Sequence, residues 1–381
     1  MLKQQKIFVD FLRFCIGSAK EIPDSLKEAD WKELYAIAKM QALLGVLFHG
    51  IRRLPKELAP EQKLLMQWMV MAEQIRKQNI RLFMDSVKVC KNFEKEGFSN
   101  CILKGQGNAL LYPDPYMRTP GDIDIYLSGG RRKIMKYVDQ VCPNQVMRYH
   151  HVDFPVTKTA IEVHFTPSYM FCPIHNRRMQ KWFEEVMGEQ CNHRVSLPDG
   201  YGEIHVPHVS FNVIYILSHL YRHIFTEGIG LRQLLDYYFV LLKWHTDLTN
   251  LTDSNNSLPQ MTQINTDLDA LRHELKYLGL WKFAGAVMYV LHEVFGLSED
   301  RMIAPMNEKE GKFLLDEIMR GGNFGQYDDR MGDKVDESKI HRYFRMNLRN
   351  LRFVKHYPTE ALSEPLFRTW FAVWKKIHGI R

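Results

Sequence analysis

The sequence lacks paired cysteines. Its six cysteines are scattered through 381 residues, and none stands in a C-x-x-C pair: Cys15, Cys90, Cys101, Cys142, Cys172 and Cys191. This spacing argues against a zinc ribbon and against a disulfide framework. It is typical of reduced, buried thiols in a cytosolic protein.

Long apolar runs are also absent. The N-terminal run Ile7–Phe14 briefly resembles the core of a signal peptide, but Asp10 and Arg13 interrupt it. No later run has the length of a transmembrane helix, and we find no internal repeat. With 45% hydrophobic and 25% charged residues, the composition is that of a globular protein. We therefore expect a soluble, cytoplasmic protein with a sizeable core.

The chain has little excess charge outside its C-terminal end. Its formal net charge is +7, yet Ser338–Arg381 alone holds ten Lys or Arg and two Glu, a net of +8. The rest of the chain is therefore close to neutral. The basic character belongs to the tail and is not spread over the protein as a general nucleic-acid signature.

The periodicity of apolar residues predicts helices at both ends of the chain and an α/β segment between them. Helical spacing covers 31–40, 42–51 and 61–96, then 209–225, 231–244, 268–278, 281–295, 308–320, 341–355 and 365–378. Polar or Gly-rich composition predicts loops at 246–266 and 321–336. The middle contains an apolar run at 101–103, possible strands at 121–127, 146–156 and 159–165, a hairpin at 195–197 and 203–206, and helices at 106–112, 131–141 and 177–187. We expect an α+β fold: a small mixed-sheet core over 96–206, an N-terminal helical region over 1–95 and a C-terminal helical region with a basic tail over 207–381.

The stretch Ser99–Leu127 holds the residues with the clearest chemistry. Strand side chains alternate between two faces, so Asp122 and Asp124 would share one face while Ile123 and Ile125 enter the core. Two neighbouring carboxylates repel each other, and a fold tolerates this most easily when a divalent cation lies between them.

A third carboxylate, Glu162, lies on a later predicted strand, on the same face as His164. If this strand lies beside the first, three acids converge as two-metal phosphoryl or nucleotidyl transfer requires. The spacing alone leaves another interpretation open: two solvent-exposed aspartates at a strand end and an unrelated glutamate.

Several motifs taken together resemble the nucleotidyltransferase superfamily, and more narrowly the bacterial uncharacterised nucleotidyltransferase family with its pattern LKG…Y…R…DiDi…LH. They are Leu103-Lys104-Gly105, Tyr112-Pro113, Arg118, Gly121-Asp122-Ile123-Asp124-Ile125 and Ile161-Glu162-Val163-His164. The motifs cover about 95–165, and the segment 219–236 resembles the helical region of the family. Their order and spacing are much more specific than a D-x-D motif.

The resemblance implies a Mg²⁺-dependent enzyme that moves NMP from an NTP such as ATP to a hydroxyl acceptor, most simply a small molecule. Asp122 and Asp124 would bind Mg²⁺, and Glu162 would bind a metal or act as the base. Gly105 and Gly121 would approach the phosphates. The superfamily often has a phosphate-binding Ser after this glycine, where the present chain has Gln106.

Two cations near these motifs have open roles. Lys104 either supplies charge to the β- and γ-phosphates or is a solvent-exposed lysine at a strand end. Arg118 either pairs with a phosphate or forms a salt bridge with Asp122 or Asp124.

His219 and His223 are four residues apart on a predicted helix, a spacing that allows two imidazoles to share a metal. No Glu follows His219, so zinc is the less favoured interpretation. We expect instead that this helix lies beside the site and that His223, Arg232 and Asp236, with His164, line an acceptor or nucleotide pocket. Arg232 and Asp236 could equally form only a helical ion pair.

The predicted C-terminal helix carries an arginine stripe at intervals of three and four residues: Arg342, Arg345, Arg349 and Arg352. Phe344, Leu348, Leu351 and Val354 lie opposite. This arginine stripe could meet phosphates, RNA, a protein partner or an anionic membrane surface. It could also be a solvated face that balances acidic residues in 328–336. Trp370, Phe371 and Trp374 are expected in the core.

Two further functions remain open at this point. A catalytically inactive relative would use its helical flanks to recognise a protein or nucleic-acid partner. An active relative could transfer AMP to a protein side chain. The acceptor, the preferred base and the oligomeric state do not follow from the sequence.

Overall fold

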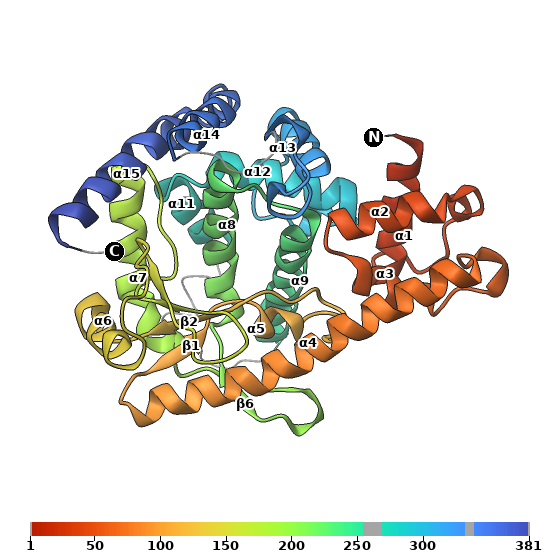
Figure 1. The fold of residues 1–381 in the computed structure, drawn as a ribbon. Coiled ribbons are helices and arrows are strands. Elements are labelled where there is room, and N and C mark those ends of the chain that lie inside the picture. The colour runs from red at the N-terminus through yellow and green to blue at the C-terminus, as the bar shows by residue number, and fades with distance from the viewer. Residues whose placement is uncertain (1, 254–267, 332–338, 380–381) are drawn as a thin grey trace.

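The computed structural model describes residues 2–253, 268–331 and 339–379 (Figure 1). It is mostly helical and contains a small mixed sheet, which confirms the expected α+β class with helical flanks. None of the described helices is long and apolar enough to cross a membrane.

The chain begins with helices α1 (Lys3–Ile16), α2 (Trp31–Met40), α3 (Leu44–Ile51) and the long α4 (Gln62–Lys95). The middle contains β1 (Asn100–Ile102), α5 (Gln106–Ala109), β2 (Ile123–Leu127), α6 (Gly130–Val141), β3 (His151–Asp153), β4 (Ile161–His164), α7 (Pro173–Gln190), β5 (Arg194–Ser196) and β6 (Glu203–His205). The C-terminal part contains α8 (Val209–Thr226), α9 (Leu231–Asp253), α11 (Leu268–Tyr277), α12 (Trp281–Val290) followed by a π turn (Leu291–Phe295), α13 (Glu308–Gly321), α14 (Lys339–Val354) and α15 (Pro358–Ile377). The expected three-part division of the chain remains a prediction.

The main sheet has the strand order β1-β2-β4-β3, in which β2 and β4 are parallel and the two outer pairs are antiparallel. Its apolar face holds Ile123, Ile125, Ile161 and Val163, all at most 3% exposed. These residues share a core with the second half of α4 and with α6. Figure 1 shows α4 running beneath the sheet and α8 and α9 standing on the other side. The polar face is therefore turned toward the C-terminal helices.

Two helices differ from the sequence prediction. The predicted loop 246–266 begins too early, because α9 continues to Asp253, and residues 254–266 lie outside the described part. The hydroxyls of Thr246 and Thr249 donate to the carbonyls of Leu242 and His245, four residues back, so these polar residues fit a helix. The last helix begins at Pro358, where proline suits the first turn, and continues through Pro365 in its interior.

Three further segments are shorter or more structured than predicted. The strand predicted over 146–156 is reduced to β3 and an isolated bridge between Met147 and Val152. The helix predicted over 106–112 ends at Ala109. The predicted loop 321–336 contains short 3₁₀ turns at Asn323–Gly325 and Asp329–Met331, and residues 332–336 lie outside the described part.

Gly45 on α3 fixes the loop that leads to the acidic strand. A Cβ atom at this position would lie 2.2 Å from the carbonyl oxygen of Met117, which is a backbone atom that cannot move aside. We predict that Gly45→Ala lowers the free energy of unfolding by about 1–3 kcal/mol, the usual cost of overpacking. Gly188→Ala on α7 is the control, because a Cβ there meets nothing within 4 Å. Chemical denaturation should show no loss for Gly188→Ala; equal losses in both variants would contradict the close approach.

Candidate active site

The polar face of the sheet is built by the register of its three acidic strands. Asp124 on β2 pairs with Glu162 on β4. Between β3 and β4, His151 pairs with His164, and Asp153 pairs with Glu162. Paired residues point to the same face. The strand alternation that buries the isoleucines therefore brings carboxylates and imidazoles together on the opposite face.

Asp124 is the centre of this group and is only 3% exposed. Its Oδ2 lies 3.1 Å from Lys104 Nζ, and its Oδ1 lies 3.0 Å from His164 Nε2. Lys104 is therefore not a solvent-exposed lysine, because its ammonium contacts both Asp124 and His219 Nε2, the latter at 3.0 Å. The charge of Lys104 and the hydrogen bond with His164 both stabilise Asp124 as the anion.

The three acids differ in their pKa. The charge of Asp124 and then burial raise the pKa of Asp122 to about 6. Burial would raise the pKa of Asp124, but Lys104 and His164 together hold it below its usual value. Burial also acts upward on the pKa of Glu162, while the hydrogen bond with His164 lowers it overall. A nearby cation would therefore stabilise the ionised form of Asp122 more than that of Asp124 or Glu162.

Metal-capable atoms converge on this face. Within the described residues, one group in which the ligand atoms lie within 4.8 Å of one another is Asp124, Glu162 and His164. Asp122 is not part of that group, but its pKa responds to the charges of Asp124 and Glu162. The geometry therefore brings Asp124 and Glu162 within reach of one ion, whereas Asp122 lies beside them in the same cavity.

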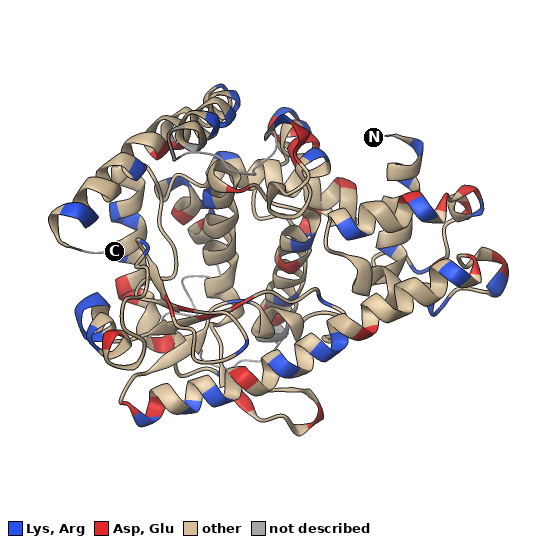
Figure 2. Ribbon diagram, in the orientation of Figure 1, with Lys and Arg blue, Asp and Glu red and all other residues tan. Residues whose placement is uncertain are grey.

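A cavity of about 1050 Å³ adjoins the acids, close to the upper size of ordinary small-molecule sites. Its walls come from the polar face of the sheet, the loop before β3, and helices α8, α9, α14 and α15. Eight basic residues line it: Lys104, Arg118, Arg148, Arg222, Arg232, Arg345, Arg368 and Lys375. Five acidic residues line it: Asp122, Asp124, Glu162, Glu227 and Asp236. Figure 2 shows Lys and Arg on the C-terminal helices α14 and α15. The excess of positive charge suits an anionic ligand.

Arg222 on α8 is a buried charge without a carboxylate partner. It is 8% exposed, and none of the described carboxylates lies within 4.0 Å of its guanidinium. Its Nη2 lies 3.0 Å from His223 Nε2 and 3.4 Å from His219 Nδ1, and its Nε makes no hydrogen bond. A buried charge normally has a counter-ion. The cavity side of Arg222 is therefore a favourable place for an anion.

His219 and His223 support Arg222 and do not form the zinc pair that their spacing allowed. Burial, with Lys104 next in importance, lowers the pKa of His219, and burial followed by Arg222 lowers that of His223 to about 4. Both rings are therefore neutral and can accept hydrogen bonds. Neither belongs to a metal-capable group of three among the described residues.

Arg118 pairs with Asp236, not with Asp122 or Asp124. Its Nε and Nη2 donate to the two carboxylate oxygens of Asp236 at 2.8 and 2.7 Å, and Tyr112 donates its hydroxyl proton at 2.7 Å. Arg232 Nη1 lies 3.8 Å from the same carboxylate. The ion pair between Arg232 and Asp236 is thus present, but Arg118 is the nearer partner.

The other predicted site residues lie in different positions. His223, Arg232 and Asp236 line the cavity, as do Gly105 and Gly121. Gly105 has a positive φ of 64°, which favours glycine. His164, expected at the acceptor pocket, is fully buried and does not line the cavity, because its hydrogen bond to Asp124 holds it behind the acids.

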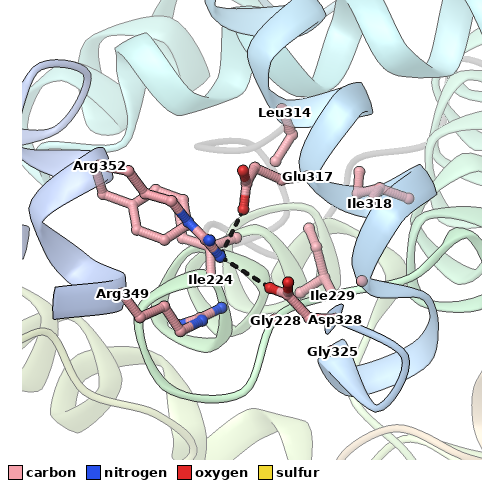
Figure 3. A pocket seen from close by; sticks show the side chains of 12 residues that line it. Ile224, Gly228, Ile229, Leu314, Glu317, Ile318, Gly325, Asp328, Arg349 and Arg352 are labelled. Carbon is pink, nitrogen blue, oxygen red and sulfur yellow. Dashed lines mark hydrogen bonds and ion pairs between the residues drawn. The ribbon is translucent and has the colours of Figure 1, made fainter. Parts of the chain in front are cut away.

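The arginine stripe on α14 is not a solvated face. Arg349 is 8% exposed, and Arg352 forms ion pairs with Glu317 at 2.7 Å and Asp328 at 3.2 Å (Figure 3). Arg345 lines the large cavity, and the side chain of Arg342 lies outside the described part. The opposite, apolar side of α14 faces outward instead: Phe344, Leu348 and Leu351 are 59–68% exposed. Asp328 supplies the balancing acid that the sequence suggested, but in a buried contact.

The aromatic end of α15 is only partly in the core. Trp370 is 51% exposed, which contradicts the expectation of burial, whereas Phe371 and Trp374 are half-buried. Phe371 lines the cavity beside Lys375. The C-terminal helix therefore forms part of the cavity wall, which its composition did not predict.

Sequence reasoning missed several residues of this site. His151 contacts Glu162, His150 contacts His151, and Arg222 lies beside the two histidines that were considered for zinc. The adjacent histidines on a polar strand end were the available signal for the first two. For Arg222 no pattern distinguishes a buried, unpaired arginine from a surface one.

The sequence matches one protein-family model. The model of a family described as "Uncharacterised nucleotidyltransferase" matches residues 27–296, most of the chain. The chain belongs to this family. No curated protein and no solved structure gives a match. The matched range includes the acidic strands and α8 and α9 but ends before α14 and α15, so the C-terminal wall of the cavity lies outside it.

Proposed function

We propose that the protein is a Mg²⁺-dependent nucleotidyltransferase that moves NMP from an NTP to a hydroxyl group of a small molecule, with release of pyrophosphate. Family membership supports the reaction class. The observation that carries the proposal is the placement of Asp122, Asp124 and Glu162 in one cavity with a buried, unpaired Arg222.

The carboxylates fit magnesium. Mg²⁺ prefers oxygen ligands, and the charge of Asp124 together with burial raises the pKa of Asp122 in spite of Lys104, so a further cation would stabilise its ionised form. Asp122, Asp124 and Glu162 would hold the ions. When bound, Mg²⁺ neutralises phosphate charge and orients the reacting oxygens.

Glu162 is better suited to hold a metal than to act as the base. Its lowered pKa keeps it ionised and makes it a weak proton acceptor. Of the two roles that the sequence left open for Glu162, metal ligand and base, the lowered pKa favours the metal ligand.

The phosphates would be held by cations of this chain. Gln106 does not replace the missing Ser, because it is 2% exposed and its Oε1 accepts from Ser86 Oγ on α4. The partly buried Lys104 beside Asp124 and the buried Arg222 on α8 are cations that can compensate for it. Arg118 is held by Asp236 and acts as a positioning residue for the loop that leads to Asp122.

The geometry favours an enzyme over an inactive binding module. Vestigial acids have no reason to remain within the reach of one cation, yet ligand atoms of Asp124 and Glu162 lie within 4.8 Å of each other. The RNA-binding version of that module also loses one of its arginines, because Arg349 is buried.

The test is calorimetry of ATP, GTP, CTP and UTP binding to the protein in the presence of Mg²⁺. At least one should bind, and Arg222→Met should weaken it by about tenfold or more, since a charge-assisted phosphate contact is lost. Because Arg222 lacks a carboxylate partner, the substitution should not lower the melting temperature. Arg349→Met is the matched control, equally buried but lying in a separate small cavity. Absence of binding by all four nucleotides, or equal weakening in both variants, would contradict the proposal.

A further inference from the structure

A second group of ligand atoms lies beside the carboxylates, on the histidine side of the same sheet face. His150, His151 and His164 are 4%, 5% and 0% exposed, and one ring nitrogen of each lies within 4.8 Å of the others. Two further groups join it: Asp124 with Glu162 and His164, and His151 with Asp153 and Glu162. These overlapping groups form one continuous cluster.

The distances within the cluster match the spacing of ligands around one ion. His151 Nδ1 lies 3.2 Å from both His150 Nε2 and Glu162 Oε2, and His164 Nε2 lies 3.6 Å from Glu162 Oε2. Zn–N distances of about 2.1 Å in a tetrahedral site place neighbouring ligand atoms roughly 3.4 Å apart. The three imidazoles, which have ligand atoms within 4.8 Å of one another, therefore lie within reach of one ion, and Glu162 lies beside them.

Hydrogen bonds alone do not satisfy this cluster. His151 Nδ1 would have to serve both His150 and Glu162, and His164 Nε2 would have to serve both Asp124 and Glu162. A neutral imidazole has one N–H, so one proton would be shared between two partners in each case. The outer nitrogens, His150 Nδ1, His151 Nε2 and His164 Nδ1, make no hydrogen bond within the described part of the chain. A cation bound by the three imidazoles would accept their lone pairs in place of these shared protons.

The surrounding charges also suit a dication. The carboxylates of Asp122, Asp124, Asp153 and Glu162 act on the cluster or on one another, and Lys104, Arg148 and Arg222 are the opposing cations. Four acids against three cations leave one formal negative charge. Three imidazoles prefer Zn²⁺ and similar transition ions to Mg²⁺.

We propose that His150, His151 and His164 bind one transition-metal ion of the Zn²⁺ class, next to Glu162 and the other carboxylates assigned to Mg²⁺. Glu162 joins the two positions: its Oε2 faces the histidines, and Oε1 takes no part in these contacts. The ion would hold β3 and β4 together at the edge of the cavity. Binding of this ion does not depend on nucleotidyl transfer.

The test uses the full-length protein after removal of metals by a chelator. Zn²⁺ calorimetry should give one ion per chain, and Co²⁺ should give the visible absorption of a tetrahedral site with nitrogen ligands. The double variant His150→Ala/His151→Ala should lower Zn²⁺ affinity at least 100-fold and abolish the Co²⁺ spectrum. His193→Ala/His208→Ala is the matched control, because these two rings also lie close together, with centroids 4.2 Å apart, but belong to no metal-capable group in the described chain.

Two more measurements keep the result interpretable. Circular dichroism shows whether the double variant is folded, and His151→Gln, which removes one ligand with less loss of volume, should still lower the affinity at least tenfold. Asp122→Asn should retain Zn²⁺ binding while it loses Mg²⁺-dependent nucleotide binding, so failure of one proposal is distinguishable from failure of the other. No Zn²⁺ binding by the wild-type protein, or unchanged binding by the folded histidine variants, would overturn the metal site.

Discussion

Asp122→Asn should abolish Mg²⁺-dependent nucleotide binding and yet raise the stability of the metal-free protein. The charge of Asp124 raises the pKa of Asp122 to about 6, so its ionised form is disfavoured in the folded state. A raised pKa of this size corresponds to about 1–3 kcal/mol of folding free energy lost at neutral pH. An amide removes the repulsion and with it one of the two aspartate ligands for the metal.

The pH dependence follows from the direction of this shift. The folded pKa lies above the unfolded value, so ionised Asp122 destabilises the fold above about pH 6, and the penalty disappears as the pH falls toward 4. Melting temperatures measured in a chelator should therefore differ most between wild type and Asp122→Asn at pH 7–8, and should converge near pH 4.

Asp139→Asn provides the control, since Asp139 is exposed on α6 and does not line the cavity. It should leave both stability and nucleotide affinity unchanged. A destabilised Asp122→Asn protein would mean that Asp122 has a structural partner; retained nucleotide binding would remove it from the metal site.

The acidic strand was predictable because its information is local. Period-two alternation placed Asp122 and Asp124 away from Ile123 and Ile125, and the isoleucines are indeed fully buried. The partner of this strand was predicted from a later E-x-H segment, and the parallel pairing of Asp124 with Glu162 has the expected form. Local patterns of this kind do not depend on how distant parts of the chain pack.

The α14 helix shows where such reasoning ends. Its arginine stripe was visible in the sequence, but which side faces the protein depends on α13 and the turn that follows it. Glu317 and Asp328 draw Arg352 inward, and Phe344 and Leu348 are left exposed. An amphipathic pattern fixes two faces of a helix, not which of them is buried.

Which charged residues pair with each other could not be predicted from the sequence either. Arg118 had nearby acids in the sequence at Asp122 and Asp124, yet its partner is Asp236, more than a hundred residues away. A buried guanidinium needs a bidentate partner of suitable geometry, and only the packing of α9 against the loop supplies one.

Asp236→Asn should be among the most destabilising single substitutions in the site. The carboxylate is 6% exposed and holds Arg118 through two hydrogen bonds, with Tyr112 and Arg232 beside it. Removing its charge leaves two buried guanidinium groups without a counter-ion. Breaking a buried pair in this way costs about 3–5 kcal/mol, which chemical denaturation should measure directly.

A second ion pair on the same helix gives the matched control. Asp247 pairs with Lys243 on the exposed side of α9, where both side chains are at least 39% exposed. Asp247→Asn should therefore cost no more than about 1 kcal/mol. A similar loss in both variants would mean that the buried pair contributes no more than a surface one.

The double variant Asp236→Asn/Arg118→Met separates charge from packing. If the penalty comes from the uncompensated guanidinium, removing Arg118 as well should recover part of the lost stability, so that the two substitutions are less damaging together than their sum. Nucleotide binding should stay weak even in the recovered protein, because Arg118 is what ties the loop before Asp122 to α9. Recovery of stability without recovery of binding would identify Asp236 as a positioning residue of the acidic site; recovery of both would reduce its role to folding alone.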